Sequence, residues 1–489
     1  MKDLTRAMLL TAVAVFTSTT GARAAPGIEP AAVRARFDRI ENSLQPAIKI
    51  EGRPFPTQSL TELMRVQHVP AISVAFIDAG QIAWVSAVGL ADVANRRAAT
   101  PGTLFQAGSI SKAVTATAAL ALVQAGSVGL DVPVNTRLAS WKIPDNEFTR
   151  QHAVTLRELL THTAGVNVIG FTGYPLGKPV PSLVQILEGA PPANTDPIRV
   201  DALPGSKWRY SGGGYTIAQL LMIEISGQTF PELLKARVLA PLAMRSSTFD
   251  QVLSSALHRR AAHGYLTSGN PLPGGHNLYP EMAAAGLWTT PSDLARWIIA
   301  IEDAAAGRSE AVLNQSSARA MLAPGLGGWG LGVEVKGAGP DLSFSHGGAD
   351  EGFRADAIGF PARHQGVVIM SNSDGGDTVI EPLLGAIARE YGWPGFEPHI
   401  IKPVSTKPGE LQVLTGRYAL GSVIFAISEA PGGQSLEGRA PGYSTFELIP
   451  QGGDAFVSAN TASPANFVRD GSGKVVALET EGITMSRLP

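Results

Sequence analysis

A serine and a lysine three residues apart are the first candidates for chemistry in this sequence. Both lie in the segment 105–112, which reads FQAGSISK. A serine hydroxyl becomes an effective nucleophile only when a base takes its proton. Residues three apart share one face of a helix, so the amine of Lys112 can point at the hydroxyl of Ser109. Burial would favour the neutral amine, and the start of a helix would favour a developing oxyanion beside Ser109.

The spacing of Ser109 and Lys112 also arises by chance, so two later stretches decide its meaning. In the segment 208–215, WRYSGGGY, Tyr210 precedes a glycine turn and can present its phenol to the nucleophile and the leaving group. In the segment 344–349, FSHGGA, His346 ends a predicted strand, and the small residues there would let a substrate backbone lie along the strand edge. The structural alternatives are an N-cap serine with a solvated lysine, a core aromatic ahead of a turn, and a β-bulge with a solvated histidine.

Together and in this order, the three stretches resemble the motifs of the penicillin-recognising serine enzymes: class C β-lactamases, serine D-peptidases and esterases of that fold. The flanking segments 159–165 (LLTHTAG) and 284–290 (AAGLWTT) also resemble this family, and the resemblance covers about residues 69–372. It implies that Ser109 is acylated, that Lys112 and Tyr210 share proton transfer, and that His346 lines the site opposite them.

The same resemblance implies an oxyanion hole and a substrate-binding surface. The backbone N–H groups of Ser109 and Ala349 would form the oxyanion hole, with Gly348 and Gly212 among the substrate-binding residues. Gly212 stands where many members of the family have asparagine, and His346 replaces the lysine that commonly contacts the β-lactam carboxylate. These departures favour an esterase or a D-amino-acid-specific peptidase over an efficient β-lactamase.

We therefore expect a secreted serine hydrolase that acts through a Ser109 acyl-enzyme on esters or short D-amino-acid-containing peptides. One alternative is a β-lactamase or DD-peptidase acting on β-lactams or cell-wall peptides, and another is a non-catalytic cell-wall-binding module. The α/β-hydrolase fold needs a G-x-S-x-G pentapeptide, which this chain lacks. The expected partners are a small-molecule ester, peptide or β-lactam substrate, with peptidoglycan as a further candidate.

Composition narrows the other possibilities. The chain has 489 residues, 44% of them hydrophobic, a formal charge of −2 and no cysteine. Such a balance gives no indication of a nucleic-acid surface, and the lack of cysteine excludes disulfides and thiolate chemistry. The histidines are scattered, with His162 in the LLTHT segment expected to brace a loop, so we expect no metal site and no cofactor.

The N-terminal residues 1–24 read as a secretory signal peptide. Lys2 and Arg6 precede an apolar stretch over residues 7–16, and a small-residue segment ends at Ala24. We expect cleavage after Ala24, a periplasmic or secreted protein and no transmembrane segment after cleavage. An uncleaved membrane anchor is the alternative.

Hydrophobic patterning predicts an α+β fold. A helix is expected over 109–124 and another over 379–391, with strands over 72–77, 81–88, 342–345, 353–360 and 366–371. Strands near both ends of this region, with helices between them, indicate one antiparallel sheet flanked by helices and a mostly helical domain. We expect a hydrolase domain over 25–393, a proline-rich linker over 394–408, and a small β-meander or barrel domain over 409–489.

Overall fold

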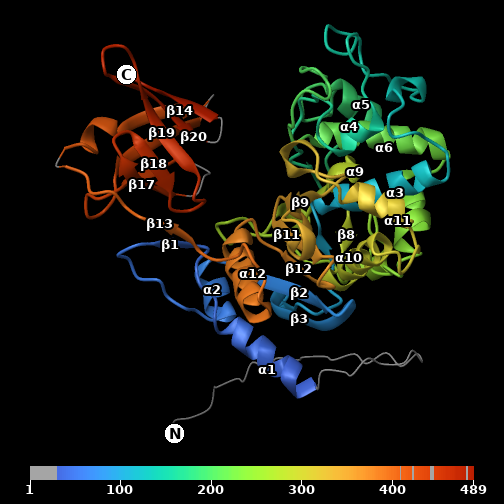
Figure 1. The fold of residues 1–489 in the computed structure, drawn as a ribbon, viewed down its shortest axis with the longest axis horizontal. Coiled ribbons are helices and arrows are strands. Elements are labelled where there is room, and N and C mark those ends of the chain that lie inside the picture. The colour runs from blue at the N-terminus through green and yellow to red at the C-terminus, as the bar shows by residue number, and fades with distance from the viewer. Residues whose placement is uncertain (1–29, 408, 421–422, 441–444, 481–482) are drawn as a thin grey trace. The chain divides into compact units, whose positions relative to one another are not determined.

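The computed structural model describes residues 30–407, 409–420, 423–440, 445–480 and 483–489 (Figure 1). The chain forms two compact units. The first contains Leu60–Ile380 with the described residues up to Asp38, and the second contains Arg39–Ser59 with Glu381–Pro489. The predicted signal peptide over 1–24 lies outside the described residues.

A seven-stranded antiparallel sheet forms the centre of the first unit. Its strand order is β4-β3-β2-β12-β11-β10-β9, and the pairing of β2 with β12 joins the two ends of this unit. The predicted sheet, built from segments far apart in the sequence, is therefore confirmed. Its strands are β2 (Ala71–Asp78), β3 (Gln81–Asp92), β4 (Arg97–Ala98), β9 (Glu334–Lys336), β10 (Ser343–Asp350), β11 (Phe353–Phe360) and β12 (Gln365–Ser371).

Helices cover the sheet and form the helical part of the same unit. Helix α10 (Pro291–Ala305) packs against β2, β11 and β12, whereas α3 (Ile110–Gln124) packs against α9 (Met282–Ala285) and β10. Most of α3 is buried, as its alanine-rich and nearly uncharged sequence predicts. The other helices of this unit are α2 (Leu60–Val66), α4 (Leu156–Leu160), α5 (Leu183–Glu188), α6 (Gly212–Ser226), α7 (Phe230–Leu234), α8 (Ser255–His258) and α11 (Gln315–Met321).

Two pairs of short strands tie the helical part together. Strand β5 (Phe105–Gln106) pairs with β8 (Trp288–Thr289), and β6 (Tyr174–Pro175) pairs with β7 (Asn277–Leu278). The first pair fixes the residues just before Ser109 against the chain that follows α9. Helices α1 (Pro30–Glu41) and α12 (Asp377–Tyr391) each contribute residues to both units.

The second unit is a closed eight-stranded barrel with one additional two-stranded sheet. Antiparallel strands follow one another in chain order, and the first pairs with the last, so no barrel edge is left open. Aromatic side chains such as Tyr418, Phe456 and Phe467 fill the interior. The barrel strands are β14 (Gly416–Leu420), β15 (Val423–Glu429), β16 (Leu436–Arg439), β17 (Phe446–Gly452), β18 (Ala455–Ser458), β19 (Pro464–Arg469), β20 (Val475–Thr480) and β21 (Ile483–Arg487).

The predicted C-terminal all-β domain is thus confirmed as a barrel, and the unit also contains an element that the sequence did not indicate. Strand β1 (Ile48–Ile50) pairs in parallel with β13 (His399–Ile401), which lies inside the segment expected to be a linker. No helix among the described residues has the length and apolarity needed to cross a membrane.

Helix α10 carries a buried carboxyl group, Glu302, towards the sheet. Its side chain is fully buried. Burial raises the pKa of Glu302 to about 8, although the backbone of Phe360 and the charge of Arg308 oppose this shift. Because the pKa of Glu302 is higher in the folded than in the unfolded protein, its protonation stabilises the fold. This contribution to the free energy of unfolding is fully present below the unfolded pKa and is lost as the pH rises through about 8.

We predict that Glu302→Gln, which stays neutral at every pH, will show a smaller loss of thermal stability between pH 5 and pH 9 than the unchanged protein. Melting temperatures measured across this range test the prediction. Glu310→Gln makes the same chemical change at an exposed position and should leave the pH dependence unaltered. An equal decline in the Glu302→Gln variant and the unchanged protein would show that Glu302 does not titrate on unfolding.

Candidate active site

Ser109 and Lys112 meet at the start of α3. The Nζ atom of Lys112 donates hydrogen bonds to Ser109 Oγ at 2.9 Å and to the backbone oxygen of Ala284 at 2.8 Å. The serine hydroxyl makes no capping bond to the helix, and Lys112 is only 2% exposed. The arrangement therefore differs from an ordinary N-cap serine with a solvated lysine.

The segment that follows α9 holds the start of α3, with Ser109 and Lys112, in place. The backbone N–H of Ala107 donates to the oxygen of Leu287 at 2.8 Å, and the N–H of Leu287 donates to Ser111 Oγ at 3.0 Å. Together with the pairing of β5 and β8, these bonds fix the distance between Lys112 and the carbonyl of Ala284. In the sequence, the segment 284–290 was singled out only because it resembles the family, and nothing indicated that the backbone oxygen of Ala284 accepts a hydrogen bond from Lys112.

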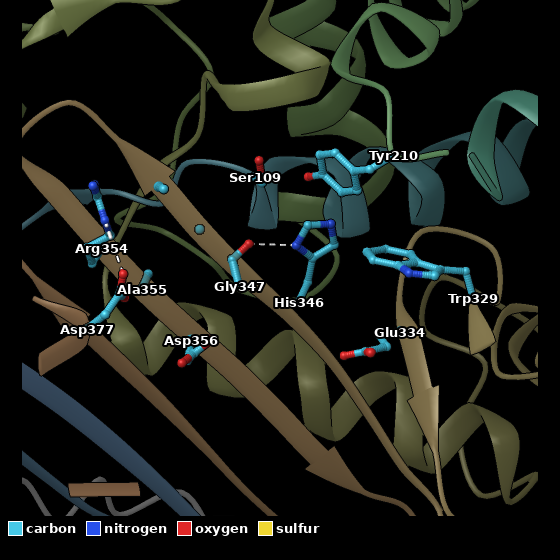
Figure 2. A pocket seen from close by; sticks show the side chains of 12 residues that line it. Ser109, Tyr210, Trp329, Glu334, His346, Gly347, Arg354, Ala355, Asp356 and Asp377 are labelled. Carbon is cyan, nitrogen blue, oxygen red and sulfur yellow. Dashed lines mark hydrogen bonds and ion pairs between the residues drawn. The ribbon is translucent and has the colours of Figure 1, made fainter. Parts of the chain in front are cut away.

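Tyr210 lies beside the lysine and is braced by a buried histidine. Its ring centroid is 5.0 Å from Lys112 Nζ and 4.3 Å from the ring of His162. The Nδ1 atom of His162 accepts the backbone N–H of Ser211 at 3.0 Å, and burial lowers the pKa of His162 well below its ordinary value. A neutral His162 thus holds the segment that carries Tyr210, and Figure 2 shows the phenol oxygen of Tyr210 turned towards Ser109.

His346 enters the site from β10 as a neutral, buried side chain. It is 4% exposed, and its Nδ1 lies 2.6 Å from the backbone oxygen of Gly347. A carbonyl oxygen only accepts, so Nδ1 carries the proton, and Nε2 is left as an acceptor that finds no hydrogen-bond partner among the described residues. Burial, and secondarily the charge of Lys112, lowers the pKa of His346 to about 3. The register of β10 with β11 is continuous at this point, so the histidine does not sit on a bulge.

Glycines allow β10 to approach the nucleophile directly. A Cβ atom on Gly348 would lie 2.0 Å from the backbone oxygen of Ala107, and one on Gly108 would lie 2.5 Å from the amide nitrogen of Ala349. Gly108 also has a φ of +50°, which an L side chain rarely adopts. The amide of Ala349 is therefore adjacent to the residue before the nucleophile.

A pocket of about 360 Å³ opens in front of Ser109 (Figure 2). Of the sequence-predicted residues, Lys112 and Gly212 do not line it. Lys112 lies beneath the surface, and the position of a Cβ atom on Gly212 would be 2.9 Å from both Ile169 O and the ring of Phe171. The lining residues are Ser109, Tyr210, Trp329, Glu334, His346, Gly347, Gly348, Ala349, Arg354, Ala355, Asp356 and Asp377.

Sequence reasoning missed the side chains that shape both ends of this pocket. Trp329 follows a glycine-rich turn that carries no recognisable signal, and its ring centroid lies 5.2 Å from that of His346. Arg354 and Asp356 alternate with apolar residues in the predicted strand 353–360, which places both on one face of the sheet. That alternation could have indicated, from the sequence alone, that Arg354 and Asp356 share the face of the sheet that lines the pocket. Within the part of the chain that the structure describes, no group of three or more His, Cys, Asp or Glu residues is placed to hold a metal ion.

A buried lysine bonded to a serine hydroxyl at the junction of an antiparallel sheet and a helical region defines a serine hydrolase of the β-lactamase-related type. The family model described as Beta-lactamase matches residues 57–389, and the chain belongs to this family.

Comparisons with known proteins agree with this assignment. The chain is 26% identical over 373 residues to penicillin-binding protein 4 of Amycolatopsis lactamdurans, covering 72% of this chain and 93% of that protein. It is 28% identical over 245 residues to the unguisins hydrolase of Aspergillus campestris, covering 48% of this chain and 44% of that protein. The chain thus matches less than half the length of the second relative.

Solved structures share the fold. The octameric penicillin-binding protein homologue from Pyrococcus abyssi superposes with a TM-score of 0.61 at 23% identity, covering 87% of this chain and 98% of that one. The structure of SurE with D-Leu superposes with a TM-score of 0.56 at 24% identity, covering 88% of this chain and 97% of that one.

We predict that Gly348→Ala will lower the free energy of unfolding by about 1–3 kcal/mol, because the new methyl group must push β10 away from Ala107. Chemical denaturation measures this change. Gly347→Ala is the matched control, since a Cβ there meets only Asp356 Oδ1 at 3.2 Å and Ala355 O at 3.9 Å. Equal stability of the two variants would contradict the close approach of β10 to Ala107.

Proposed function

We propose that the protein hydrolyses esters or short D-amino-acid-containing peptides through an acyl-enzyme on Ser109. The observation that carries this proposal is the buried Lys112 amine, which lies 2.9 Å from Ser109 Oγ and, among the described residues, has only one other hydrogen-bond acceptor, Ala284 O. Such an amine is suited to accept the hydroxyl proton as the serine attacks a carbonyl carbon. A non-catalytic binding module would have no use for this pair.

The reaction would proceed in two halves. In the first, Ser109 Oγ bonds to the carbonyl carbon while its proton passes to Lys112, and the alcohol or amine departs with a proton from Lys112 or Tyr210. In the second, water attacks the acyl-enzyme, its proton passes to the same groups, and Ser109 is released with the acid product. The backbone N–H groups of Ser109 and Ala349 are our candidates for the oxyanion hole, supported by the adjacency of Ala349 to Gly108.

The surroundings of the pocket favour esters and D-peptides over β-lactams. His346 offers a neutral ring where the family commonly has a lysine that attracts the β-lactam carboxylate, and its pKa of about 3 keeps it neutral at physiological pH. Phe171 and Ile169 O occupy the space beside Gly212, so no polar side chain extends from that position. The similarity to an unguisins hydrolase supports a hydrolytic function, whereas the similarity to a penicillin-binding protein keeps the β-lactam alternative as an outcome of the test.

We further propose that the protein is exported, on the strength of the signal-like residues 1–24 and the similarity to a penicillin-binding protein. Export would give the enzyme access to cell-wall peptides as well as to small esters. Peptidoglycan is therefore a candidate partner of the pocket or of the barrel.

We predict that a fluorophosphonate will label the protein at Ser109 and that p-nitrophenyl acetate will be turned over, with both reactions abolished in Ser109→Ala. Mass spectrometry of the labelled peptide and absorbance assays measure these outcomes. Ser316→Ala removes an exposed serine outside the pocket and should preserve both. Absence of labelling and of turnover in the unchanged protein would refute the enzyme, whereas nitrocefin hydrolysis rivalling ester hydrolysis would reverse the substrate ranking.

Replacement of Lys112 tests the role of the base separately. We predict that Lys112→Ala lowers kcat/KM for p-nitrophenyl acetate by about 10²–10⁴, the usual contribution of a general base. Lys112→Arg should lose a similar factor, because a guanidinium keeps the positive charge but does not give up its proton. Lys142→Ala, at an exposed position, is the control. If Lys112→Arg retained most of the activity, the side chain would act through its charge and not as a base.

A further inference from the structure

The loop that joins β10 to β11 closely follows the candidate oxyanion-hole residue Ala349. Asp350 pairs with Phe353 where the two strands meet, so the loop itself consists of two residues, Glu351 and Gly352. A connection this short fixes the register of the two strands and leaves the end of β10 little freedom to move without the loop. The groups that hold this loop therefore also set the position of the Ala349 amide.

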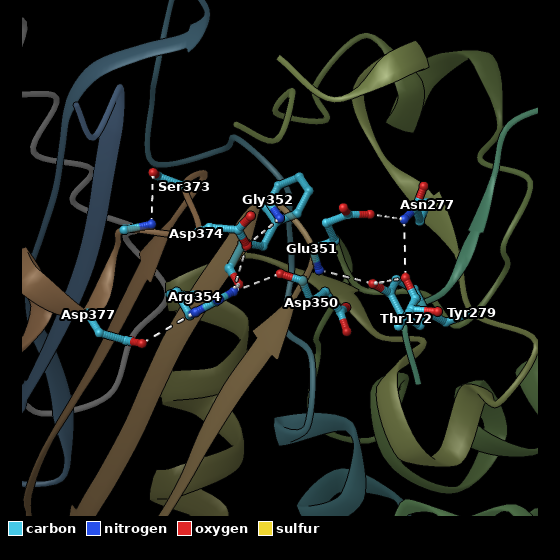
Figure 3. Close-up of polar contacts among 12 residues, drawn as sticks. Thr172, Asn277, Tyr279, Asp350, Glu351, Gly352, Arg354, Ser373, Asp374 and Asp377 are labelled. Atoms are coloured by element: carbon cyan, nitrogen blue, oxygen red, sulfur yellow. Dashed lines mark hydrogen bonds and ion pairs between the residues drawn. The ribbon is translucent and has the colours of Figure 1, made fainter. Parts of the chain in front are cut away.

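Two side chains from distant segments bind the backbone of the loop. The N–H of Glu351 donates to Tyr279 Oη at 3.0 Å, and the N–H of Gly352 donates to Asp374 Oδ1 at 2.8 Å (Figure 3). Tyr279 directly follows β7, whereas Asp374 lies shortly after β12, where its own N–H donates to the backbone oxygen of Tyr265 at 2.8 Å. The loop is thus attached both to the central sheet and to the helical part of the unit.

Arg354, the second residue of β11, completes the attachment to Asp374. Its Nη1 atom donates to the backbone oxygens of Asp350 at 2.9 Å and Phe353 at 2.7 Å and to Asp374 Oδ1 at 3.0 Å. Its Nε atom lies 3.3 Å from Asp377 Oδ2. The guanidinium is rigid and its side chain is only 21% exposed, so it holds both backbone oxygens in place where water has limited access to replace it.

The end of β10 that this network holds lies against the nucleophile. A Cβ atom on Gly108 would lie 2.5 Å from the amide nitrogen of Ala349 and 3.0 Å from the carbonyl carbon of Gly348. Both Ser109 and Ala349 line the pocket. An oxyanion hole is effective only when its donors lie about 2.7–3.1 Å from the developing charge, so a shift of β10 by about 1 Å would remove most of the contribution of Ala349.

Arg354 also lines the pocket, so direct binding of a substrate carboxylate is the alternative role for its charge. The acceptors that already surround its guanidinium oppose this role. Asp374 is not one of the residues that line the pocket. Its removal would leave Arg354 free to bind an anion but would release the loop, and the two roles therefore predict different results.

We propose that Arg354 and Asp374 are positioning residues for the oxyanion hole, because they hold the β10–β11 loop where the N–H of Ala349 stays beside Ser109. The proposal rests on the proposed function, since it concerns the hole that serves the Ser109 acyl-enzyme. Both residues act through the backbone of β10 and exchange neither a proton nor a bond with the substrate.

Two matched substrates measure the contribution of the oxyanion hole: p-nitrophenyl acetate and p-nitrophenyl thionoacetate, in which sulfur replaces the carbonyl oxygen. Sulfur is larger and a weaker acceptor than oxygen, so the hole stabilises the intermediate from the oxygen ester far better. The ratio of kcat/KM for the ester to kcat/KM for the thionoester therefore falls when the hole is displaced. A ratio measured on one enzyme preparation does not depend on the fraction that folds.

We predict that Arg354→Met and Asp374→Ala each lower this ratio by about 3- to 30-fold, which is part of the factor of about 10²–10³ that loss of a whole donor costs. The double variant should lose little more than either single variant, because both act through one loop. Asp374→Asn keeps an oxygen for the N–H of Gly352 but loses the ion pair, so it should lower the ratio by a smaller factor even if the other variants fail to fold.

A second arginine–aspartate pair near the other end of the same two strands provides the matched control. Arg363 Nη2 donates to Asp341 Oδ1 at 2.6 Å, and neither residue lines the pocket. Arg363→Met and Asp341→Ala should therefore leave the ratio unchanged.

The possible results separate this inference from the function on which it rests. If Arg354→Met weakens both reactions equally while Asp374→Ala behaves like Asp341→Ala, Arg354 contacts the substrate directly and the positioning role is wrong. An unchanged ratio in every variant would also overturn it, while the hydrolase assignment would stand. If the unchanged protein hydrolyses neither substrate and Ser109 is not labelled by the fluorophosphonate, the proposed function itself fails.

Discussion

The hydrogen bonds of one buried amine organise the catalytic corner of this protein. Lys112 Nζ has two acceptors, and they belong to segments more than 170 residues apart, Ser109 at the start of α3 and Ala284 in α9. Leaving an amine buried without partners is costly, so both acceptors must be present for Lys112 to be accommodated. The pairing of β5 with β8 and the bond from Leu287 to Ser111 bring these segments together. Much of the packing between α3 and α9 can be understood as the means of providing these two acceptors.

The same low-polarity surroundings favour the neutral forms of the ionisable groups around this amine. Burial lowers the pKa of His162 well below its ordinary value and that of His346 to about 3. It raises the pKa of Glu281 to about 7 and that of Asp350 well above its ordinary value. Desolvation is the largest cause in all four cases. Apart from Lys112, the groups behind Ser109 therefore contribute little fixed charge, whereas the carboxyl groups of Asp356 and Asp377 line the pocket.

Local sequence was sufficient for the parts of the structure that depend on periodicity. The strand expected over 353–360 is β11, the helix expected over 109–124 is α3 with one residue less, and the three-residue spacing does place Lys112 on the serine. Periodicity does not predict which residues distant in sequence come into contact. A backbone oxygen such as that of Ala284 has no sequence signature, and Trp329 reaches the pocket through a loop whose course depends on tertiary packing. Gly212 was expected at the substrate surface from resemblance alone, but Phe171 and Ile169, which are distant in sequence, fill the space around it.

The parallel pairing of β1 with β13 has a consequence for how the chain must be made. Ile50 leaves the ribosome early, yet its strand partner Ile401 follows roughly 350 residues later, which at about 5–20 residues per second is a wait of roughly 20 to 70 seconds. During that time the backbone groups of β1 lack their native partner, while most of the hydrolase region has already been synthesised. The C-terminal unit is therefore the last part of the protein that can be completed, and it needs a segment from each end of the chain.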